Sequence, residues 1–596
     1  MSTPTKTRMP IAIDSFSNQD LSCKHVTTTD FMQFNVAKIL PVVKGQSFNI
    51  KHETFTRLEP LAVPTFGDAH IYNRAYFVPI RTIFPAFEEF ITNVPHVYAD
   101  GTSSMVTSTP MVTEGIIADT FVLPALSEEL WDTATVYDFK LQDTVTGAAT
   151  VVGKKYKLTN FGRRMWKLMR TLGYSMFMNT ASIEPASLLP LYAVARVYLD
   201  SYYPAQYAND DDSNFVLSLL QNNEYSKRIN SLSAEELLRL FRIIDNVCYH
   251  SDLFTQAWDN PNAPNNGLSS PVTIPDVNDT APNDRTTSVK YEADPYNSAP
   301  YLIDEQGGAL NKISQFALNA LRKLTDYMKR HQLAGSRVID RYLARFGVAL
   351  SSDKLRRSYK LFESVDNLHF GDVTSTSDTE GAALGAFAGK GVGFNQGSFE
   401  FTSEEDYGYI VIVSTIVPVT KMYQGVNRIT KHLSPLDFWT PEFDGLGVQA
   451  IASQEVYSPV DGSGANLDYA QKVFGFGPRY YEYKIGYDLI TGDYILRTMN
   501  AGKDSWTLFR DMKPYVDSIG GADNLVHDFD FINGSDASQF NRIFNNTSND
   551  ADHFNVVHNF VIKSRFPGRS LWDTYEFETD GKANSVSMEV GGRTEN

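Results

Sequence analysis

The chain has 596 residues, well beyond the length at which a single hydrophobic core usually stops growing, so we expect several domains or one domain with very large loops. Hydrophobic residues make up 42% of the chain and charged residues 21%, a composition that excludes an intrinsically disordered protein. The 70 acidic residues outnumber the 53 Lys and Arg residues, for a formal net charge of -17. This charge excludes a globally basic nucleic-acid-binding protein, so any contact with nucleic acid must be local or made through a basic partner.

Cysteine usage and hydropathy exclude further classes. The chain has two cysteines, Cys23 and Cys248, far apart and without metal-ligand spacing, which excludes a disulfide framework or a zinc ribbon and suits a reducing compartment. The polar N-terminus lacks the apolar segment of a secretory signal. The longest apolar stretch, residues 409–419, is interrupted by polar residues and a proline, and is shorter than the ~20 residues that span a bilayer. We expect neither secretion by a signal peptide nor a membrane span.

The first half of the chain predicts strands and then helices. Aromatic residues, 13% of the chain, suit half-buried sheet surfaces, and residues 48–55 and 75–78 are strand candidates. Residues 188–198 predict a helix with Pro190 near its first turn. A second helix begins at Ser233 with a capping box. Its predicted buried face consists of Leu237, Leu240, Phe241 and Ile244.

The middle of the chain is dominated by predicted loops around one long helix. Residues 209–214 and 259–300 are crowded with Asn, Asp, Pro, Ser and Gly and have little with which to build a core. Residues 311–331 carry apolar side chains at helical spacing and predict the clearest helix in the chain. A second, glycine-rich loop is predicted over residues 371–397.

The C-terminal part predicts strands again. Residues 409–417 are rich in β-branched side chains and end at a proline, as expected of a strand buried on both faces. Residues 479–488 alternate aromatic and polar side chains with period two, and with residues 494–497 they predict a hairpin closed by a glycine-containing turn. Residues 554–563 and 574–578 complete the strand candidates.

These elements favour one class of architecture. A loop-rich β protein with few helices fits a sandwich or jelly roll with long insertions, and does not fit alternating βαβ units. The sequence contains no internal repeat, which argues against a solenoid or a propeller.

No motif predicts catalysis, a cofactor or a metal. The run 389–394 is glycine-rich but lacks the strand, helix and GKS or GKT of a phosphate-binding loop, so we interpret it as a loop. Asp210, Asp211 and Asp212 lack the alternate spacing of a calcium loop and predict a solvated acidic loop. His553 and His558 have the wrong parity for one strand face and are interpreted as structural, and Cys248 as a core residue. We therefore expect a protein that is not an enzyme.

Local basic clusters are the candidates for nucleic-acid contact. Arg163, Arg164, Trp166, Lys167 and Arg170 interleave charge with aromatic surface, a pattern suited to phosphate contact and base stacking. A solvated helix face or a subunit contact explains the same residues, and is the interpretation that we favour. The remaining basic candidates are Lys6, Arg8, Lys354, Arg356 and Arg357.

Short strings along the chain resemble one protein family. They occur in the family's order over most of the chain, and include Leu-Pro-Leu-Tyr-Ala at 189–193, Phe-Gly-Val at 346–348, Asp-Phe-Trp-Thr-Pro at 437–441, Leu-Gly-Val-Gln at 446–449 and Asp-Ser-Trp at 504–506. The chain thereby resembles the major capsid protein of the Microviridae, small single-stranded DNA phages, and more closely the gokushovirus-like branch. The residues after Gly520 match weakly.

The resemblance implies a fold and a function. The fold would be a single eight-stranded antiparallel jelly-roll barrel with long loop insertions and a few helices. Sixty copies would form a T=1 icosahedral shell around a single-stranded DNA genome, as a virion assembled in the host bacterial cytoplasm. Other partners would be a small basic DNA-binding protein, a pilot protein, an internal scaffolding protein and a host-surface receptor. The net charge of -17 makes a basic partner physically sensible, because packaged phosphate needs counter-charge.

The resemblance also implies a division of the chain. Residues 1–30 would form an N-terminal arm, residues 31–204 the first jelly-roll strands, and residues 301–596 the helix at 311–331 with the remaining strands and a C-terminal segment. Residues 205–300 would form a surface insertion that builds threefold protrusions for host attachment. Candidates on this insertion are Asp210, Asp211, Asp212, Trp258, Asp259, Asn260, Asn278 and Asp279. A carbohydrate-active or carbohydrate-binding β-sandwich is the alternative that the composition leaves open.

Overall fold

The computed structural model of this protein contains most of the strands that the sequence predicts. It describes residues 16–97, 101–114, 131–142, 149–174, 182–203, 211–221, 231–232, 234–257, 272–274, 287–292, 301–304, 323, 342–343, 345–348, 357–371, 390–403, 407–420, 425–433, 435–446, 448–458, 473–486, 488–494, 503–512, 527, 529–548 and 551–568.

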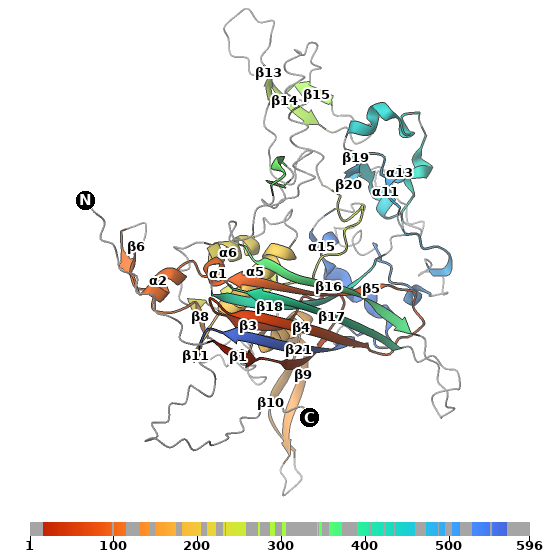
Figure 1. Ribbon diagram of the computed structural model, residues 1–596. Helices are drawn as coiled ribbons and strands as arrows, with labels where there is room; N and C mark the ends of the chain where they lie inside the picture. The colour runs from red at the N-terminus through yellow and green to blue at the C-terminus, as the bar shows by residue number, and fades with distance from the viewer. Residues whose placement is uncertain are drawn as a thin grey trace, which may run out of the picture.

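A large curled sheet forms the centre of the molecule (Figure 1). In chain order its nine strands are β1 (Ser17–Asp20), β2 (Cys23–Thr29), β3 (Asn35–Val42), β4 (Ser47–Leu58), β5 (Ala69–Pro79), β16 (Tyr359–Gly371), β17 (Lys390–Thr402), β18 (Gly408–Pro418) and β21 (Phe554–Phe566). The spatial order is β1-β21-β4-β17-β16-β5-β18-β3, with β2 also on β21, and every pairing is antiparallel. Because β1 and β2 pair with opposite ends of β21, they act as one interrupted edge strand.

The strand order is that of a jelly roll. One half of the sheet contains β2, β21, β4 and β17, and the other contains β16, β5, β18 and β3. Among the described residues, the strand pairing that connects the halves is that of residues 369–371 of β16 with residues 390–392 of β17. Strands from opposite ends of the chain are neighbours, as β21 and β4 show, and this arrangement is the double Greek key of jelly-roll folds. The predicted fold class, an eight-stranded antiparallel jelly roll with long insertions, is confirmed.

Alternation along the strands creates the core between the two halves. On β4 every second side chain from Phe48 to Leu58 is buried, and β21 repeats the pattern from Phe554 to Ser564. Strict period-two burial fixes the register, because a slip by one residue would turn the whole apolar set toward solvent. One interior cluster includes Ala37, Leu40, Phe48, Ile50, Phe77, Ile410, Ile412, Phe560 and Ile562.

Helices cover the outer face of β5 and β18, which explains why β18 is buried on both sides. The helices of this layer are α1 (Ile80–Ile83), α4 (Asn160–Thr171), α5 (Leu189–Ser201), α6 (Asp211–Gln221) and α8 (Ala234–Ile243). Helix α5 contacts both strands and α1 contacts β5, while α4 contacts the neighbouring β3 and α6 contacts α1 and α8. Val411, Val413 and Val417 face them and share one large core cluster with Leu191 and Val194 of α5. The helices predicted at residues 188–198 and after Ser233 are thus confirmed as α5 and α8, with a proline in the first turn of α5.

Two insertions account for the length of the chain. The one between β5 and β16 holds the helices above, α2 (Phe87–Thr92) and the short strands β6 (His96–Val97), β7 (Ser103–Ser104), β8 (Met111–Glu114), β9 (Trp131–Gln142), β10 (Ala149–Leu158), β11 (Ser182–Ser187), β12 (Ser231–Leu232), β13 (Val272–Ile274), β14 (Thr287–Glu292) and β15 (Tyr301–Asp304). The sheet β13-β14-β15 stands apart from the central sheet at the top of Figure 1.

The second insertion, between β18 and β21, builds a lobe with its own core. Its elements are η3 (Arg428–Lys431), η4 (Pro435–Asp437), η5 (Pro441–Leu446), β19 (Val448–Ala452), α11 (Ser453–Val456), β20 (Val473–Pro478), α13 (Tyr481–Lys484), η6 (Gly492–Tyr494), η7 (Asp504–Trp506), α15 (Phe529–Ile532) and η8 (Gly534–Ile543). Ile451, Val456, Phe474 and Tyr481 are buried there together with Leu253 and Phe254 from the first insertion. We call residues 425–494 of this insertion the lobe.

Strand predictions at residues 48–55, 75–78, 409–417 and 554–563 are confirmed by β4, β5, β18 and β21. The hairpin predicted at residues 479–488 and 494–497 is wrong in its described part, because residues 481–484 form helix α13 and residues 492–494 a 3-10 turn. Tyr481 and Glu482 are consecutive, yet Tyr481 bonds Glu455 and Glu482 bonds Gln449 inside the lobe. Tyr480 turns the chain with a φ of 59° so that both side chains reach inward. Tertiary contacts therefore override the period-two pattern.

The glycine-rich loop predicted at residues 371–397 is also partly wrong, because residues 390–397 belong to β17. Three of its glycines face crowded positions in the core. A Cβ at Gly391 would lie 2.7 Å from a methyl carbon of Leu58, and one at Gly393 would overlap Ile71. These glycines make room for large neighbouring side chains. Composition alone does not distinguish glycines of this kind from the glycines of a loop.

Two predicted loops contain regular structure. Residues 211–214 begin α6, because Val216, Leu219 and Leu220 bury an apolar face and acidic residues are favourable at a helix N-terminus. Within residues 259–300 the short strands β13 and β14 form part of a sheet. The helix predicted at residues 311–331, apart from Lys323, and the strand predicted at residues 574–578 lie outside the described residues.

Candidate nucleic-acid and subunit interfaces

Helix α4 carries the basic cluster that the sequence singled out. The Thr159 hydroxyl caps it by accepting a hydrogen bond from the Gly162 backbone N–H at 3.1 Å. Met165 and Met169 are buried, and Trp166 is half-buried against the same core. The apolar face of α4 thus packs against the core, and its basic side chains lie on the other faces of the helix.

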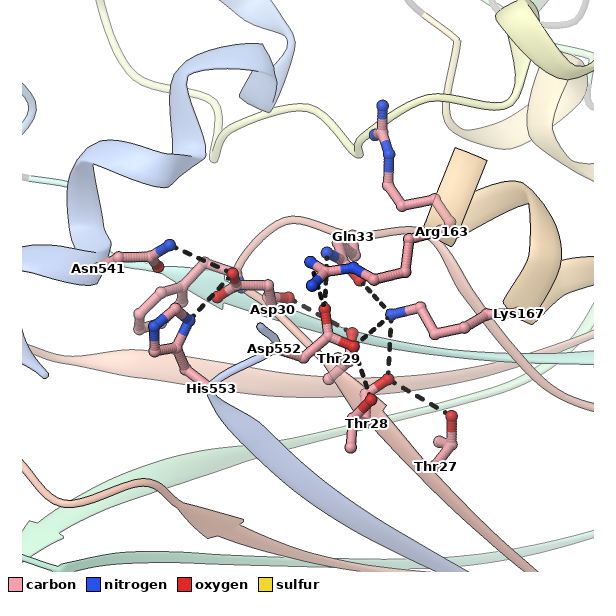
Figure 2. Close-up of polar contacts among 12 residues, drawn as sticks. Thr27, Thr28, Thr29, Asp30, Gln33, Arg163, Lys167, Asn541, Asp552 and His553 are labelled. Atoms are coloured by element: carbon pink, nitrogen blue, oxygen red, sulfur yellow. Dashed lines mark hydrogen bonds and ion pairs between the residues drawn. The ribbon is translucent and has the colours of Figure 1, made fainter. Parts of the chain in front are cut away.

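Lys167 and Arg163 converge on one buried carboxylate, Asp552 (Figure 2). The Lys167 ammonium donates to Asp552 Oδ2 at 2.6 Å, to Gln33 Oε1 at 2.9 Å and to the Thr28 carbonyl at 3.2 Å. Arg163 lies 3.3 Å from the other Asp552 oxygen. Burial opposes ionisation of Asp552, whose side chain is 4% exposed, but Lys167 and Arg163 outweigh it and lower the pKa.

A second ion pair lies beside the first. Asp30 accepts from the Phe31 backbone N–H at 2.9 Å, from His553 Nδ1 at 3.1 Å and from Asn541 at 3.3 Å (Figure 2). The other His553 nitrogen lies 2.7 Å from the Asn546 carbonyl, so both ring nitrogens face acceptors. Burial lowers the pKa of His553, but the bond to Asp30 and its charge raise it overall, which favours an imidazolium. His553 is thus a structural histidine, as predicted.

Together these pairs tie α4 to one end of the barrel edge, where β2 ends and β21 begins. We call Asp30, Arg163, Lys167, Asp552 and His553 the α4 clamp. Its members come from the turn after β2, from α4 and from the entry to β21, so segments more than 380 residues apart meet at one point. Their charges are satisfied within the chain, which is what a structural tie requires.

The other basic candidates have different surroundings. Arg164 forms an ion pair with Asp245 at 2.6 Å, and Arg357 lies 3.9 Å from Asp200. Arg170 is exposed at the end of α4. Contact of these residues, or of the α4 clamp, with DNA is untested and stays a prediction. Lys6, Arg8, Lys354 and Arg356 lie outside the described residues.

The insertion candidates are only partly described. Asp212 lies in α6 and forms an ion pair with Arg239 at 2.7 Å, which joins α6 to α8. Asp211 is the first residue of α6. The candidates outside the described residues are Asp210, Trp258, Asp259, Asn260, Asn278 and Asp279.

A small polar cavity of about 220 Å³ adjoins the α4 clamp. Its lining brings Arg163 and Arg164 together with Asp30 and Asp245, so carboxylates balance the guanidinium groups. This balance does not favour an anionic ligand. In the part of the chain that the structure describes, no three His, Cys, Asp or Glu side chains are grouped to hold a metal ion.

The lobe exposes an apolar surface that sequence reasoning missed. We call it the lobe patch, and it consists of Ile429, Leu433, Phe438, Trp439, Tyr483, Ile485 and Leu489. Leu433 is 91% exposed and Leu489 is 71% exposed. The ring of His432 lies 5.2 Å from Phe438 and 5.8 Å from Tyr483, which places these side chains side by side. Phe438 and Tyr483 are thus grouped around His432, and the other exposed side chains belong to the same lobe; apolar exposure of this kind marks an interaction surface.

The signal for the lobe patch in the sequence was weak. The Asp-Phe-Trp-Thr-Pro string at 437–441 can be recognised, but the period-two pattern of residues 479–488 places Tyr483 and Ile485 on the apolar face of a strand. The turn at Tyr480 and helix α13 bring Tyr483 to the surface instead, with 52% of it exposed.

None of the helices among the described residues has the length and hydropathy to cross a membrane.

Comparisons with known proteins agree with the jelly-roll fold. The family model described as Capsid protein (F protein) matches residues 10–130 and 268–545, more than half of the chain. The Capsid protein VP1 of Chlamydia phage 1 is 23% identical over 562 residues, which cover 84% of this chain and 87% of that protein. The Capsid protein VP1 of Bdellovibrio phage phiMH2K is 24% identical over 210 residues, which cover 33% of this chain and 37% of that protein. The resemblance to the major capsid protein of the gokushovirus-like Microviridae is thereby confirmed, and the chain belongs to the capsid protein (F protein) family.

Proposed function

We propose that this chain is the major capsid subunit of a microvirus and that sixty copies of it close into a T=1 icosahedral shell around a single-stranded DNA genome. The observation that carries the self-assembly is the lobe patch. Seven large apolar side chains on one lobe are exposed in the isolated chain, and a monomeric protein has no use for such a surface.

The physical basis of assembly is burial of this patch between copies. Each Å² of apolar surface removed from water contributes about 25 cal/mol, so even a modest contact repeated around closed symmetry axes stabilises a shell. The jelly roll supplies a rigid body from which the lobe projects, as Figure 1 shows at the upper right. Function then lies in association, and we propose no catalytic chemistry for the chain.

A surface protrusion within residues 205–300 is part of the same proposal, but only a part of this stretch is assigned to it. Helices α6 and α8 bury Val216, Leu219, Leu237 and Leu240 in the main core, so these two helices belong to the body. The sheet β13-β14-β15, which stands apart in Figure 1, supports a protrusion built from residues after 257. Such a protrusion would meet a host-surface receptor.

The remaining partners follow from charge and from the family. A chain with a net charge of -17 cannot neutralise packaged phosphate, so we propose a small basic DNA-binding protein inside the shell. A pilot protein, an internal scaffolding protein, location in the virion and assembly in the host bacterial cytoplasm belong to the same proposal.

Leu433→Glu is expected to prevent assembly and leave the subunit folded. A charge at this apolar position of the lobe patch would have to be desolvated in every contact that buries it, whereas a 91% exposed position tolerates it in the free chain. Sedimentation velocity should show fast particles for the original chain and only slow subunits for the variant. Leu433→Met, which keeps the apolar surface, is the matched control and should form particles. Particles of normal size from Leu433→Glu would refute the role of the patch.

Deletion of residues 259–296 is expected to spare the barrel and remove surface protrusions. The deleted stretch includes β13 and β14, which pair with each other and with β15 and with no strand of the central sheet. Circular dichroism and thermal unfolding should match the full chain, and electron micrographs of particles should lack their knobs. Loss of the cooperative unfolding transition would show that the segment belongs to the barrel.

A further inference from the structure

The outward face of one half of the jelly roll carries a row of apolar side chains that no described part of the chain covers fully. The register pairs Phe394 of β17 with Phe55 of β4, Phe55 with Val557 of β21, and Val557 with Val26 of β2. All four side chains point away from the barrel interior, because their strand neighbours are the buried ones. We call the outward surface of β1, β2, β21, β4 and β17 the open sheet face.

Exposure along the row shows that it is available for binding. Phe394 is 53% exposed and Val26 is 73% exposed, while Phe55 and Val557 between them are half-buried. Val392, two residues before Phe394 on β17, is 45% exposed. The result is an apolar strip that crosses four strands, with an exposed aromatic ring near one end.

Charge on this face is opposite to that of the whole chain. Its basic side chains are Lys24, Lys51, Arg57, Lys563 and Arg565, and its acidic side chains are Asp20, Glu53 and Glu400. Lys51 is paired with Glu53 at 2.6 Å and Lys563 with Asp20. The described face is therefore net positive, although the chain carries a net charge of -17.

Cations and aromatic rings alternate along the same face. The Arg57 guanidinium lies 5.2 Å from the centre of the Phe55 ring, and the Arg565 guanidinium lies 4.5 Å from that of Phe16. The two units lie at opposite ends of β4 and β21, ten strand positions or roughly 33 Å apart along the strands. Exposed rings with cations beside them on a sheet form the pattern that stacks bases and holds phosphates of a single strand.

We propose that the open sheet face binds single-stranded DNA, with bases stacked on Phe394 and Phe55 and phosphates held by Lys24, Arg57 and Arg565. This inference rests on the proposed function, since it makes the open sheet face the surface that meets the genome. Net positive charge favours a polyanion over a second copy of this acidic chain. Stacking on rings is tolerant of base identity, so the binding has no sequence preference.

The test is fluorescence anisotropy of the purified full chain with a labelled 20-nucleotide oligo(dT). Phe394→Ala is expected to weaken binding about tenfold, within the range for loss of one base–aromatic stack. Arg57→Ala is expected to reduce the slope of log affinity against log salt concentration by about 0.7, the value for one phosphate contact of a single strand. Phe66→Ala, at a 64% exposed ring outside the lobe patch and the open sheet face, and Lys360→Ala on β16 are matched controls and should bind like the original chain. A duplex of the same length should bind more weakly than oligo(dT), because its bases are not free to stack.

Two outcomes would overturn the inference. Affinity of Phe394→Ala within twofold of the original chain would show that no base stacks there. Normal oligo(dT) binding with loss of particles in Phe394→Ala and Val26→Ser would make the face a contact between protein subunits. The proposed function fails separately, if the original chain forms no particles, whereas particles with unchanged DNA binding in the variants would refute the inference alone.

Discussion

Replacing Asp552 with alanine is expected to lower the free energy of unfolding by about 3–5 kcal/mol, the cost of leaving buried charges without a partner. The change would strip the Lys167 ammonium, whose side chain is 15% exposed, of its carboxylate, and would leave Arg163 without the same group. It would also remove the acceptor of the Thr28 hydroxyl, which bonds Asp552 at 2.6 Å. Urea denaturation followed by fluorescence measures the effect.

Two further variants distinguish the effect of the lost charge on stability from the effect of lost packing. Asp366→Ala on β16 removes an exposed carboxylate and should change stability by less than about 0.5 kcal/mol. Combining Asp552→Ala with Lys167→Met should recover part of the loss, because the unpaired cation is gone. A loss below about 1 kcal/mol for Asp552→Ala would mean that the α4 clamp does not stabilise the barrel edge.

Acid is expected to destabilise the barrel through two histidines buried in its interior. His52 Nε2 and His558 Nδ1 lie 3.1 Å apart, and the Thr54 hydroxyl is within 3.1 Å of both. Among the described residues, His52 Nδ1 and His558 Nε2 have no hydrogen-bond partner. Burial lowers the pKa of His52 to about 3, although Glu53 opposes the shift, and burial with the nearby His52 and His25 lowers the pKa of His558 as well.

The sign of the pH dependence follows from proton uptake. Between pH 6.5 and about 3 the unfolded chain protonates both histidines while the folded barrel keeps them neutral, so the unfolded state binds more protons. Stability should therefore fall as the pH drops below 6.5, by up to about 1.4 kcal/mol per pH unit for each histidine. His553 acts in the opposite direction, because its raised pKa contributes stability below pH 6.5 that is lost as the pH rises through the folded value.

The measurement is the urea midpoint from pH 7 to pH 4. His52→Phe, next to Phe560 with ring centres 4.4 Å apart, should flatten the curve relative to the original chain. Equal slopes for the original chain and for His52→Phe would contradict the buried neutral state.

Local patterns were sufficient to predict the barrel strands but not how they pair. The β-branched run of β18 and the alternation on β4 and β21 are period-two signals that the core satisfies. The pairing of β21 with β4 joins residues about 500 positions apart, from Phe554 with Leu58 to Arg565 with Ser47, and neither segment encodes that choice by itself. The lobe was the hardest part to predict, because contacts such as those of Tyr481 and Glu482 decide its turns.

The candidate site shows the same limit. The sequence identified the cations of α4, yet the partners Asp552 and Asp245 lie far away along the chain and become neighbours only in the fold. The open sheet face was missed because Phe55 and Phe394 belong to different strands, and only the register places them together. Isolated residues can be recognised from a sequence, whereas a surface requires the pairing of strands.

The central claim is that this chain closes into a small shell. Electron microscopy of the purified chain, produced with the products of its neighbouring open reading frames and sized by sedimentation, tests it most directly. The account predicts uniform small icosahedral particles with surface knobs and a single fast-sedimenting species. A soluble monomer or dimer under the same conditions, with no particles in the micrographs, would contradict it.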